Sequence, residues 1–425
     1  MISEFFRQLK IVFLDGDLRK KILFILGILV VFRVGAALPI PGIDIGRLQT
    51  LFANNQFLGL LNIFSGGTLD NMSIMMLGLS PYITASIVMQ LLTLIFPPLK
   101  ELYHEEGEAG RQKFNQYSRL LTLPLAILQG FGLLTLLIRQ GVIMPLDPFG
   151  YIVNISIVAA GALFLMWLGE LISEYGIGNG ASVLIFAGIV ASVPAVIGQT
   201  TFTYEASQLP IIIAFILISL ITVGGVVLIN EGQRPIPVSY AKQIRGMKMY
   251  GGIATYLPLR VNQAGVIPII FAISILIFPQ MIANFLAGIS GGILSAIANF
   301  VVGVMNNPWI YALLYFTLVF LFTYFYTAVT FDPEAISKNL QKQGAFIPGI
   351  RPGNSTAEYL YKILNRLTLI GALFLGLIAV LPLGIRAITG LAALTIGGTA
   401  ILIVVSVILD TIKKIQAQIS MREYQ

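Results

Sequence analysis

The amino-acid sequence predicts an all-α membrane protein with ten transmembrane helices, and three observations lead to that prediction. First, 57% of the 425 residues are apolar and only 11% are Asp, Glu, Lys or Arg, whereas soluble domains carry about 25% charged residues. Second, the charged residues separate runs of about 20 apolar residues, the length that crosses a bilayer as a helix. Third, Lys and Arg gather in alternate connections between these runs, as the positive-inside rule requires.

The charge-poor runs give the ten predicted helices in order. Arg33 is the one charged residue inside the first run. The seventh run is long enough for two helices, and turn-forming residues around 288–292 and 306–308 predict the connection between them. The runs are 22–43, 71–99, 120–138, 148–169, 175–204, 206–230, 261–331 (two helices), 367–385 and 387–409.

The positions of the lysines and arginines predict the orientation in the membrane. With the N-terminus inside the cell, only Arg47, Arg139 and Arg386 face outward and Arg33 lies within a helix, while the other 22 of the 26 face the cytoplasm. An eleventh span between 283 and 306 would move the basic loop 332–365 to the outside. We therefore predict ten helices with both chain ends in the cytoplasm.

The two ends of the chain are predicted to lie at the inner membrane surface. Residues 1–21 mix charged side chains with Phe5, Phe6, Leu9 and Phe13, a pattern typical of an amphipathic helix lying on a membrane. Residues 410–425 are predicted to form a cytoplasmic tail.

Ten helices divide into two halves of five, residues 22–204 and 205–409. Because five is odd, the second half must enter the membrane in the opposite orientation. In each half a long connection precedes a helix that opens with proline, Pro81 or Pro268. Corresponding irregular helices in inverted halves indicate a pathway between the halves. Two unrelated proline-containing helices are the alternative.

The segment 58–73, between the first two helices, is apolar at one end, small and polar at the other, and too short to span. Irregular backbone cannot face lipid. The segment is therefore either an exposed outer loop or a re-entrant element buried in protein, and composition does not decide between the two.

Few ionisable residues lie within the predicted spans, which argues against an ion-coupled transporter of small solutes. Arg33 lies near mid-span and is expected to contact backbone carbonyls or a polar partner, whereas Glu170 and Asp410 lie near inner ends. The chain has no cysteine, and its one histidine, His104, lies in a charged loop. Nor does it contain a Gly-rich phosphate loop with Lys and Ser/Thr. We expect no cofactor and no catalysis, so a partner must supply energy for any uphill movement.

Two inner loops, 231–262 and 332–365, are the other informative feature. The first mixes β-branched residues, Gly and Pro with spaced cations, and the second places Arg351 between two Gly/Pro turns. Such cations are either signals for membrane orientation or docking points for an acidic or RNA partner.

Six blocks of sequence carry a resemblance to a known family: FRVGAALPIPGID (32–44), LGLSPYITASI (77–87), MWLGELISEYGIGNG (166–180), VNQAGVIP (261–268), GAFIPGIRPG (344–353) and GGT (397–399). In this order they resemble the bacterial SecY family of protein-conducting channels. The resemblance implies an hourglass pore between the two halves. It implies a passive channel in the bacterial cytoplasmic membrane, which passes unfolded preproteins and releases membrane proteins sideways into lipid.

The resemblance also implies roles for particular residues. A narrow ring would form the seal, and an aliphatic ring blocks ions by expelling water; Ala181 is small for this role. The segment 60–73 would be the plug. The implied ring is Leu79, Ile83, Ala181, Ile185, Ile270 and Ile403, and the implied plug core is Leu61, Asn62, Ile63, Phe64, Ser65, Gly66, Gly67, Thr68, Leu69 and Asp70.

The second and seventh helices would form a lateral gate that contains Ser86, Gln90, Ile267 and Ser274. The implied partners are the small membrane subunits SecE and SecG, the SecA motor, the ribosome, signal-sequence-bearing preproteins and the lipid bilayer. Arg245, Lys248 and Arg351 would be the residues on which the motor and the ribosome dock.

Overall fold

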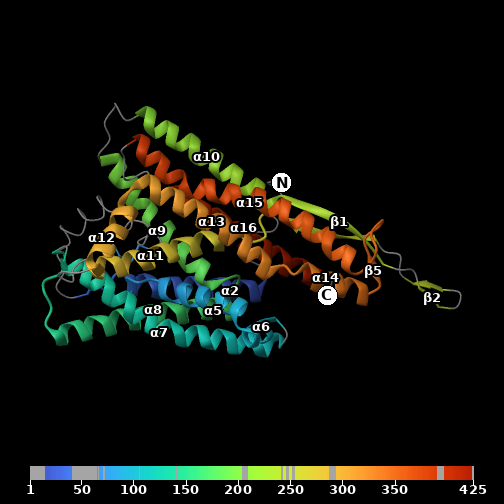
Figure 1. The fold of residues 1–425 in the computed structure, drawn as a ribbon, viewed down its shortest axis with the longest axis horizontal. Helices are drawn as coiled ribbons and strands as arrows, with labels where there is room; N and C mark the ends of the chain where they lie inside the picture. Colours follow the sequence, from blue (N-terminus) through green and yellow to red (C-terminus); the bar gives the residue numbers. More distant parts are fainter. Residues whose placement is uncertain are drawn as a thin grey trace.

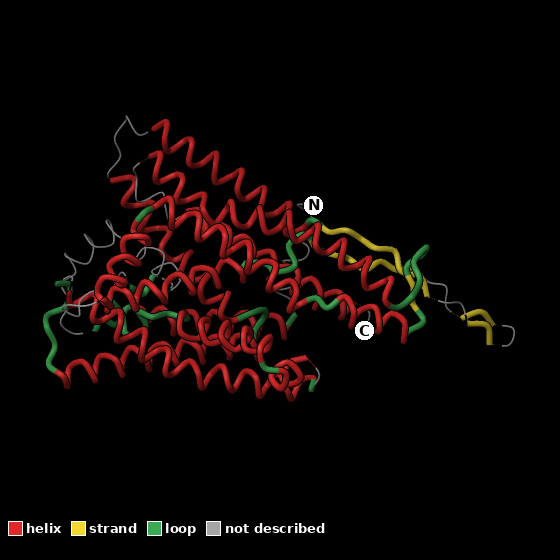
Figure 2. The backbone as a smooth tube through the Cα atoms, in the orientation of Figure 1, coloured by secondary structure: helices red, strands yellow, loops and turns green. Residues whose placement is uncertain are grey.

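Long helices lying side by side make up most of the molecule, and a group of strands extends beyond one end (Figure 1). We call this the strand end and the opposite one the far end (Figure 2). The computed structural model describes residues 15–40, 65, 67–69, 72–104, 106–139, 141–202, 209–240, 243–245, 248–250, 254–286, 293–389 and 397–423.

Each of the ten predicted helices is matched by a helix of the structure. These are α2 (Gly16–Ala36), α5 (Ser80–Ile95), α7 (Gly107–Arg139), α8 (Pro148–Tyr175), α9 (Gly180–Phe202), α10 (Leu209–Glu231), α11 (Ile267–Leu286), α13 (Pro308–Thr330), α15 (Asn354–Thr389) and α16 (Gly397–Glu423). Three shorter helices, α6 (Pro97–His104), α12 (Ile293–Asn306) and α14 (Pro333–Lys342), lie between them.

Five of the described helices, α7, α8, α10, α13 and α15, are by themselves long and apolar enough to cross a membrane. The pair α5 and α6 would count as a sixth span, but the chain bends by 112° between them. The described parts of α9 and α11 contain shorter apolar stretches, Gly180–Pro194 and Ile267–Leu276. Helix α2 carries Arg33, and α16 carries charged residues from Asp410 onward.

Three helices begin where the sequence places an Asp-Pro or Asn-Pro pair. Asp147, Asn307 and Asp332 are the N-caps of α8, α13 and α14, and each side chain accepts a hydrogen bond from a backbone N–H of the first turn. The following proline fits the first helical position because its missing N–H would have no partner there.

The two halves meet along two seams. Within the first half, α5, α7, α8 and α9 pack in chain order, and within the second half α11, α13, α15, α16 and α10 pack together. Across the halves, α11 contacts α5 and α7 along one seam, and α16 contacts α9 along the other. The pathway predicted between the halves is bounded by these two seams.

The strand end has its own small core. Strand β1 (Gln233–Tyr240) pairs antiparallel with β4 (Ala254–Arg260) on one edge and with β5 (Ala345–Phe346) on the other. Ile236, Val238, Ile347 and Leu360 are buried in one cluster, so the two inner loops fold together into one unit. Beyond it, β2 (Gln243–Arg245) pairs with β3 (Lys248–Tyr250). The bundle is all-α as predicted, but the sequence analysis did not foresee these strands.

Candidate functional site

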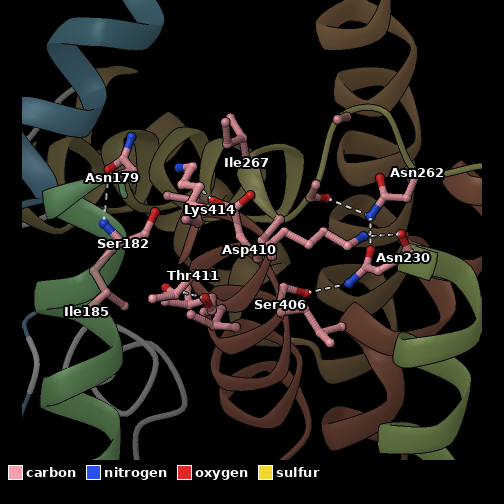
Figure 3. Close-up of a pocket in the computed structure, with 18 of the residues that line it drawn as sticks. Asn179, Ser182, Ile185, Asn230, Asn262, Ile267, Ser406, Asp410, Thr411 and Lys414 are labelled. Atoms are coloured by element: carbon pink, nitrogen blue, oxygen red, sulfur yellow. Dashed lines mark hydrogen bonds and ion pairs between the residues drawn. The ribbon is translucent and has the colours of Figure 1, made fainter. Parts of the chain in front are cut away.

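A cavity of about 300 Å³ lies between α9, α11 and α16. Much of its lining is polar, including Asn179, Asn230 and Asn262, and Ile185, Ile270 and Ile403 form an aliphatic part. Figure 3 shows Asn179, Ser182 and Ile185 on the α9 side, with Asp410 and Lys414 of α16 facing them. Residues from both halves therefore line one space.

The six residues implied for the pore ring belong to the main hydrophobic cluster of the bundle or pack against it, and three of them, Ile185, Ile270 and Ile403, also line the cavity. Leu79, Ile83, Ile185, Ile270 and Ile403 are buried members of the cluster, although they come from α9, α11, α16 and the beginning of α5. Ala181 is partly buried against the same cluster.

Helices α8 and α9 approach closely beside Ala181. A Cβ added to Gly180 would lie 1.8 Å from the carbonyl oxygen of Gly169. Glycine is therefore required at position 180 by backbone contact, and Ala181 follows it at the beginning of α9.

Helices α5 and α11, which meet along one seam, carry the four residues implied for a lateral gate. Ser274 is buried and donates a hydrogen bond to the carbonyl of Ile270 at 2.9 Å. Ile267 lines the cavity. Ser86 and Gln90 are half-buried on α5, and Oε1 of Gln90 is buried without a hydrogen-bond partner.

A buried polar pair beside this seam escaped the sequence analysis. Nε2 of Gln129 on α7 lies 3.4 Å from the hydroxyl of Thr84 on α5, and both side chains are buried. The available signal was a glutamine inside an apolar run, because polar residues within membrane spans mark packing contacts or pathways.

A second polar network ties the beginning of α11 to its neighbours. Asn262 donates to Oδ1 of Asn230 at 2.8 Å and to the carbonyl of Gly265 at 3.1 Å. Asn230 donates to the hydroxyl of Ser406 at 2.9 Å, and Lys413 forms an ion pair with Glu231 at 2.8 Å. The network joins α10, α16 and the chain that enters α11 (Figure 3).

Arg33 makes the contact that was predicted for it. Its guanidinium donates to the carbonyl oxygens of Ala187 and Gly188 on α9, at 3.0 and 3.3 Å. Of the other charged residues near the spans, Glu170 pairs with Arg119 and Asp410 pairs with Lys414. Arg33 therefore serves as a packing contact between α2 and α9, whereas Asp410 and Lys414 form their ion pair at the lining of the cavity.

The described part of the segment 58–73 is buried in protein. Leu69 belongs to the main cluster, and Thr68, fully buried, has its hydroxyl 2.9 Å from the carbonyl of Met75. The chain at 72–74 pairs with 38–40 through hydrogen bonds from Ile40 to Met72 and from Ile74 to Leu38. This supports the re-entrant alternative for the part described. Leu61, Asn62, Ile63, Phe64, Gly66 and Asp70 lie outside the described residues.

The three implied docking residues lie at the strand end. Arg351 is exposed, and its backbone is fixed because its carbonyl accepts from Thr356 at 2.9 Å and Ser337 donates to the carbonyl of Gly353 at 2.6 Å. Gly349 and Gly353 have φ of +82° and +95°, a region that favours glycine. Arg245 and Lys248 are paired directly across β2 and β3; their side chains lie outside the described parts.

Comparison with known proteins decides the family. A model of the SecY family matches residues 73–412. The chain belongs to the SecY family. The Protein translocase subunit SecY of Mycobacterium tuberculosis is 44% identical over 445 residues, covering 100% of this chain and 99% of that protein. The SecY of Streptomyces galbus is 44% identical over 432 residues and 97% of both chains.

Solved structures show the same fold as this SecY-family chain. The structure of a protein-conducting channel has a TM-score of 0.64 at 19% identity, covering 93% of this chain and 91% of that one. Sec61 in the canine ribosome–channel complex has a TM-score of 0.61 at 18% identity, with the same coverage. The ten-helix arrangement around a pore is thus the SecY fold, and the chain is a multi-pass membrane protein.

Proposed function

We propose that this SecY-family chain is the channel subunit of a protein translocase: it passes unfolded polypeptides across the bacterial cytoplasmic membrane without catalysing a reaction. The observation that carries the proposal is that Ile185 of the first half and Ile270 and Ile403 of the second half line one cavity, while Leu79 and Ile83 are buried in the same hydrophobic cluster. An aliphatic constriction excludes water and ions, yet it has no fixed hydrogen-bonding pattern that would select one substrate.

The seam between α5 and α11 serves in this proposal as the lateral gate, with Ser86, Gln90, Ile267 and Ser274 along it. The buried Oε1 of Gln90 has no hydrogen-bond partner, so the closed seam holds a polar group at a cost. An apolar signal sequence would leave through this seam into lipid. The segment 60–73 serves in this proposal as the plug, which the burial of Thr68 and Leu69 supports.

The strand end serves as the docking surface for the SecA motor and the ribosome, through Arg245, Lys248 and Arg351. Arg245 and Lys248 are partners in the backbone register of β2 and β3, and Arg351 is exposed. Cations in these positions would bind an acidic or RNA partner. SecE and SecG are the proposed membrane partners. The proposed domain boundaries follow residues 21, 204 and 409.

A small-solute transporter is the rival function. It predicts a charged or polar site near mid-membrane, but Arg33 is occupied by backbone carbonyls and Glu170 by Arg119. A passive channel, which needs no such site, agrees better with these contacts than a small-solute transporter does.

Crosslinking to a substrate tests the pathway. A cysteine replacing Ile403, which lines the cavity, is expected to form a disulfide with a cysteine in a preprotein arrested during SecA-driven translocation. The matched control is Ile408→Cys on the same helix, because Ile408 is 40% exposed and absent from the cavity lining. Equal yields at the two positions, or bridging at position 408 alone, would show that the polypeptide takes another route.

Labelling from outside tests the proposed orientation. Because the chain has no cysteine, Met144→Cys and Ser355→Cys each give one thiol, both at exposed positions. In intact cells an impermeant thiol reagent should label only the cysteine at Met144, in the far-end connection of α7 and α8. After cell lysis both should react. Labelling at Ser355 before lysis would reverse the orientation.

A further inference from the structure

The connection between α11 and α13 contains α12, an uncharged helix of 14 residues. At 1.5 Å per residue it is about 21 Å long, too short for a hydrocarbon core of about 30 Å. It lies at the far end of the bundle and contacts α11 and α13 (Figure 1). A helix of this length is too short to span the membrane, and its apolar composition makes full exposure to water unfavourable.

One face of α12 packs on the protein and the other does not. Ala298 is 2% exposed, and Met305 packs against the main cluster. Ile297 and Phe300, which lie on the opposite face, are 58% and 72% exposed. The open face therefore presents two large apolar side chains, with Asn299 exposed beside them.

This open face is continuous with the lipid-facing surface of α13. Asn307 alone separates the two helices and caps α13, and the first turns of α13 expose Trp309 (75%) and Leu313 (68%). Tryptophan is enriched where membrane meets water. The exposed apolar surface thus runs from α13, inside the membrane, onto α12 without a charged residue between them.

We infer that α12 is an interfacial helix, whose Ile297–Phe300 face lies in the far-end leaflet at the boundary between headgroups and acyl chains. An apolar helix face buried about 5–10 Å into that boundary is stable without spanning. Since α12 is the next described helix after α11 and packs on it, the lipid contact would fix the depth of the far end of α11. This location does not depend on the gate proposed for α11.

Spin labelling of the reconstituted translocase tests the inference. A nitroxide on Phe300→Cys should be reached by oxygen, which partitions into lipid, several-fold more readily than by a water-soluble nickel chelate, relative to the same ratio at Tyr256→Cys. Tyr256 is 65% exposed on β4 and provides the water reference, and Leu313→Cys on α13 provides the lipid reference. The ratio at Phe300 should lie between the two references, nearer to Leu313.

Two other results would overturn the inference. A ratio at Phe300 equal to that at Tyr256 would place the face in water. Low access for both reagents, as expected for a label at the buried Ala298, would mean that protein covers the face. Because Phe300 is largely exposed, its replacement removes little packing, and the measurement needs no translocation. A failed channel assay would therefore leave this result unaffected.

Discussion

Replacing Ile83 and Ile270 together with serine is expected to give a folded channel that leaks ions at rest. Both residues are 8% exposed in the main cluster, and Ile270 lines the cavity. Two hydroxyls in an aliphatic constriction allow water to enter, and ions follow the water. Conductance in planar bilayers, without motor or substrate, should rise well above that of the unaltered channel.

The same helices supply a matched control. Ile87 on α5 and Ile273 on α11 are each 1% exposed and lie about one turn further along. Serine at these two positions removes packed side chains at roughly 2–4 kcal/mol each, so the thermal midpoint should fall more than in the first pair. The Ile87→Ser/Ile273→Ser variant should not raise the ion conductance. If only the Ile87/Ile273 pair leaked, the ring would be misplaced by a turn. If the Ile83→Ser/Ile270→Ser variant were stable and conducted no more ions than the unaltered channel, neither residue would belong to the pore seal.

Arg351→Glu is expected to abolish SecA-driven secretion while the protein still inserts into the membrane. The two glycines of positive φ and the hydrogen bonds from Ser337 and Thr356 fix the backbone around Arg351, so neighbouring cations cannot easily take its place. A bidentate guanidinium contact has no equivalent in a carboxylate, and the reversed charge adds repulsion.

The control for charge alone is Arg111→Glu, at an exposed position near the beginning of α7 in the other half. It makes the same change in net charge and should retain most translocation of a preprotein into proteoliposomes. Comparable losses in both variants would assign the effect to net charge. Normal translocation by Arg351→Glu would reduce the loop to an orientation signal.

The sequence predicted the membrane helices well and their ends less well. The beginning of α8 at Pro148 follows from the Asp147–Pro148 pair, a local signal. Helices α7 and α15 begin at Gly107 and Asn354, well before the predicted runs at 120 and 367. Charged residues mark where a helix leaves the membrane, but a helix continues through Lys and Arg because both have good helix propensity.

The site predictions had two sources, the type of a single residue and the family resemblance, and the roles taken from the resemblance stay predictions. The aliphatic ring and Arg351 came from the family resemblance, and the contact of Arg33 with backbone carbonyls followed from the cost of a charge in lipid. The network of Asn230, Asn262 and Ser406 was not predictable from the sequence, because Asn230 lies 32 residues from Asn262 and 176 residues from Ser406 along the chain. Such contacts exist only once the helices have packed.

The two seams between the halves differ in how the chain crosses them. The chain passes from the first half to the second only once, between α9 and α10, and α9 forms the seam with α16. At the seam of α5 and α7 with α11, no connection leads directly along the chain from one side to the other. Topologically the wall around the pore is a slit tube rather than a closed ring. A polypeptide held at both ends, by a ribosome on one side and a folded domain on the other, could leave a closed ring only after one end was freed, but it can pass through a slit at any time.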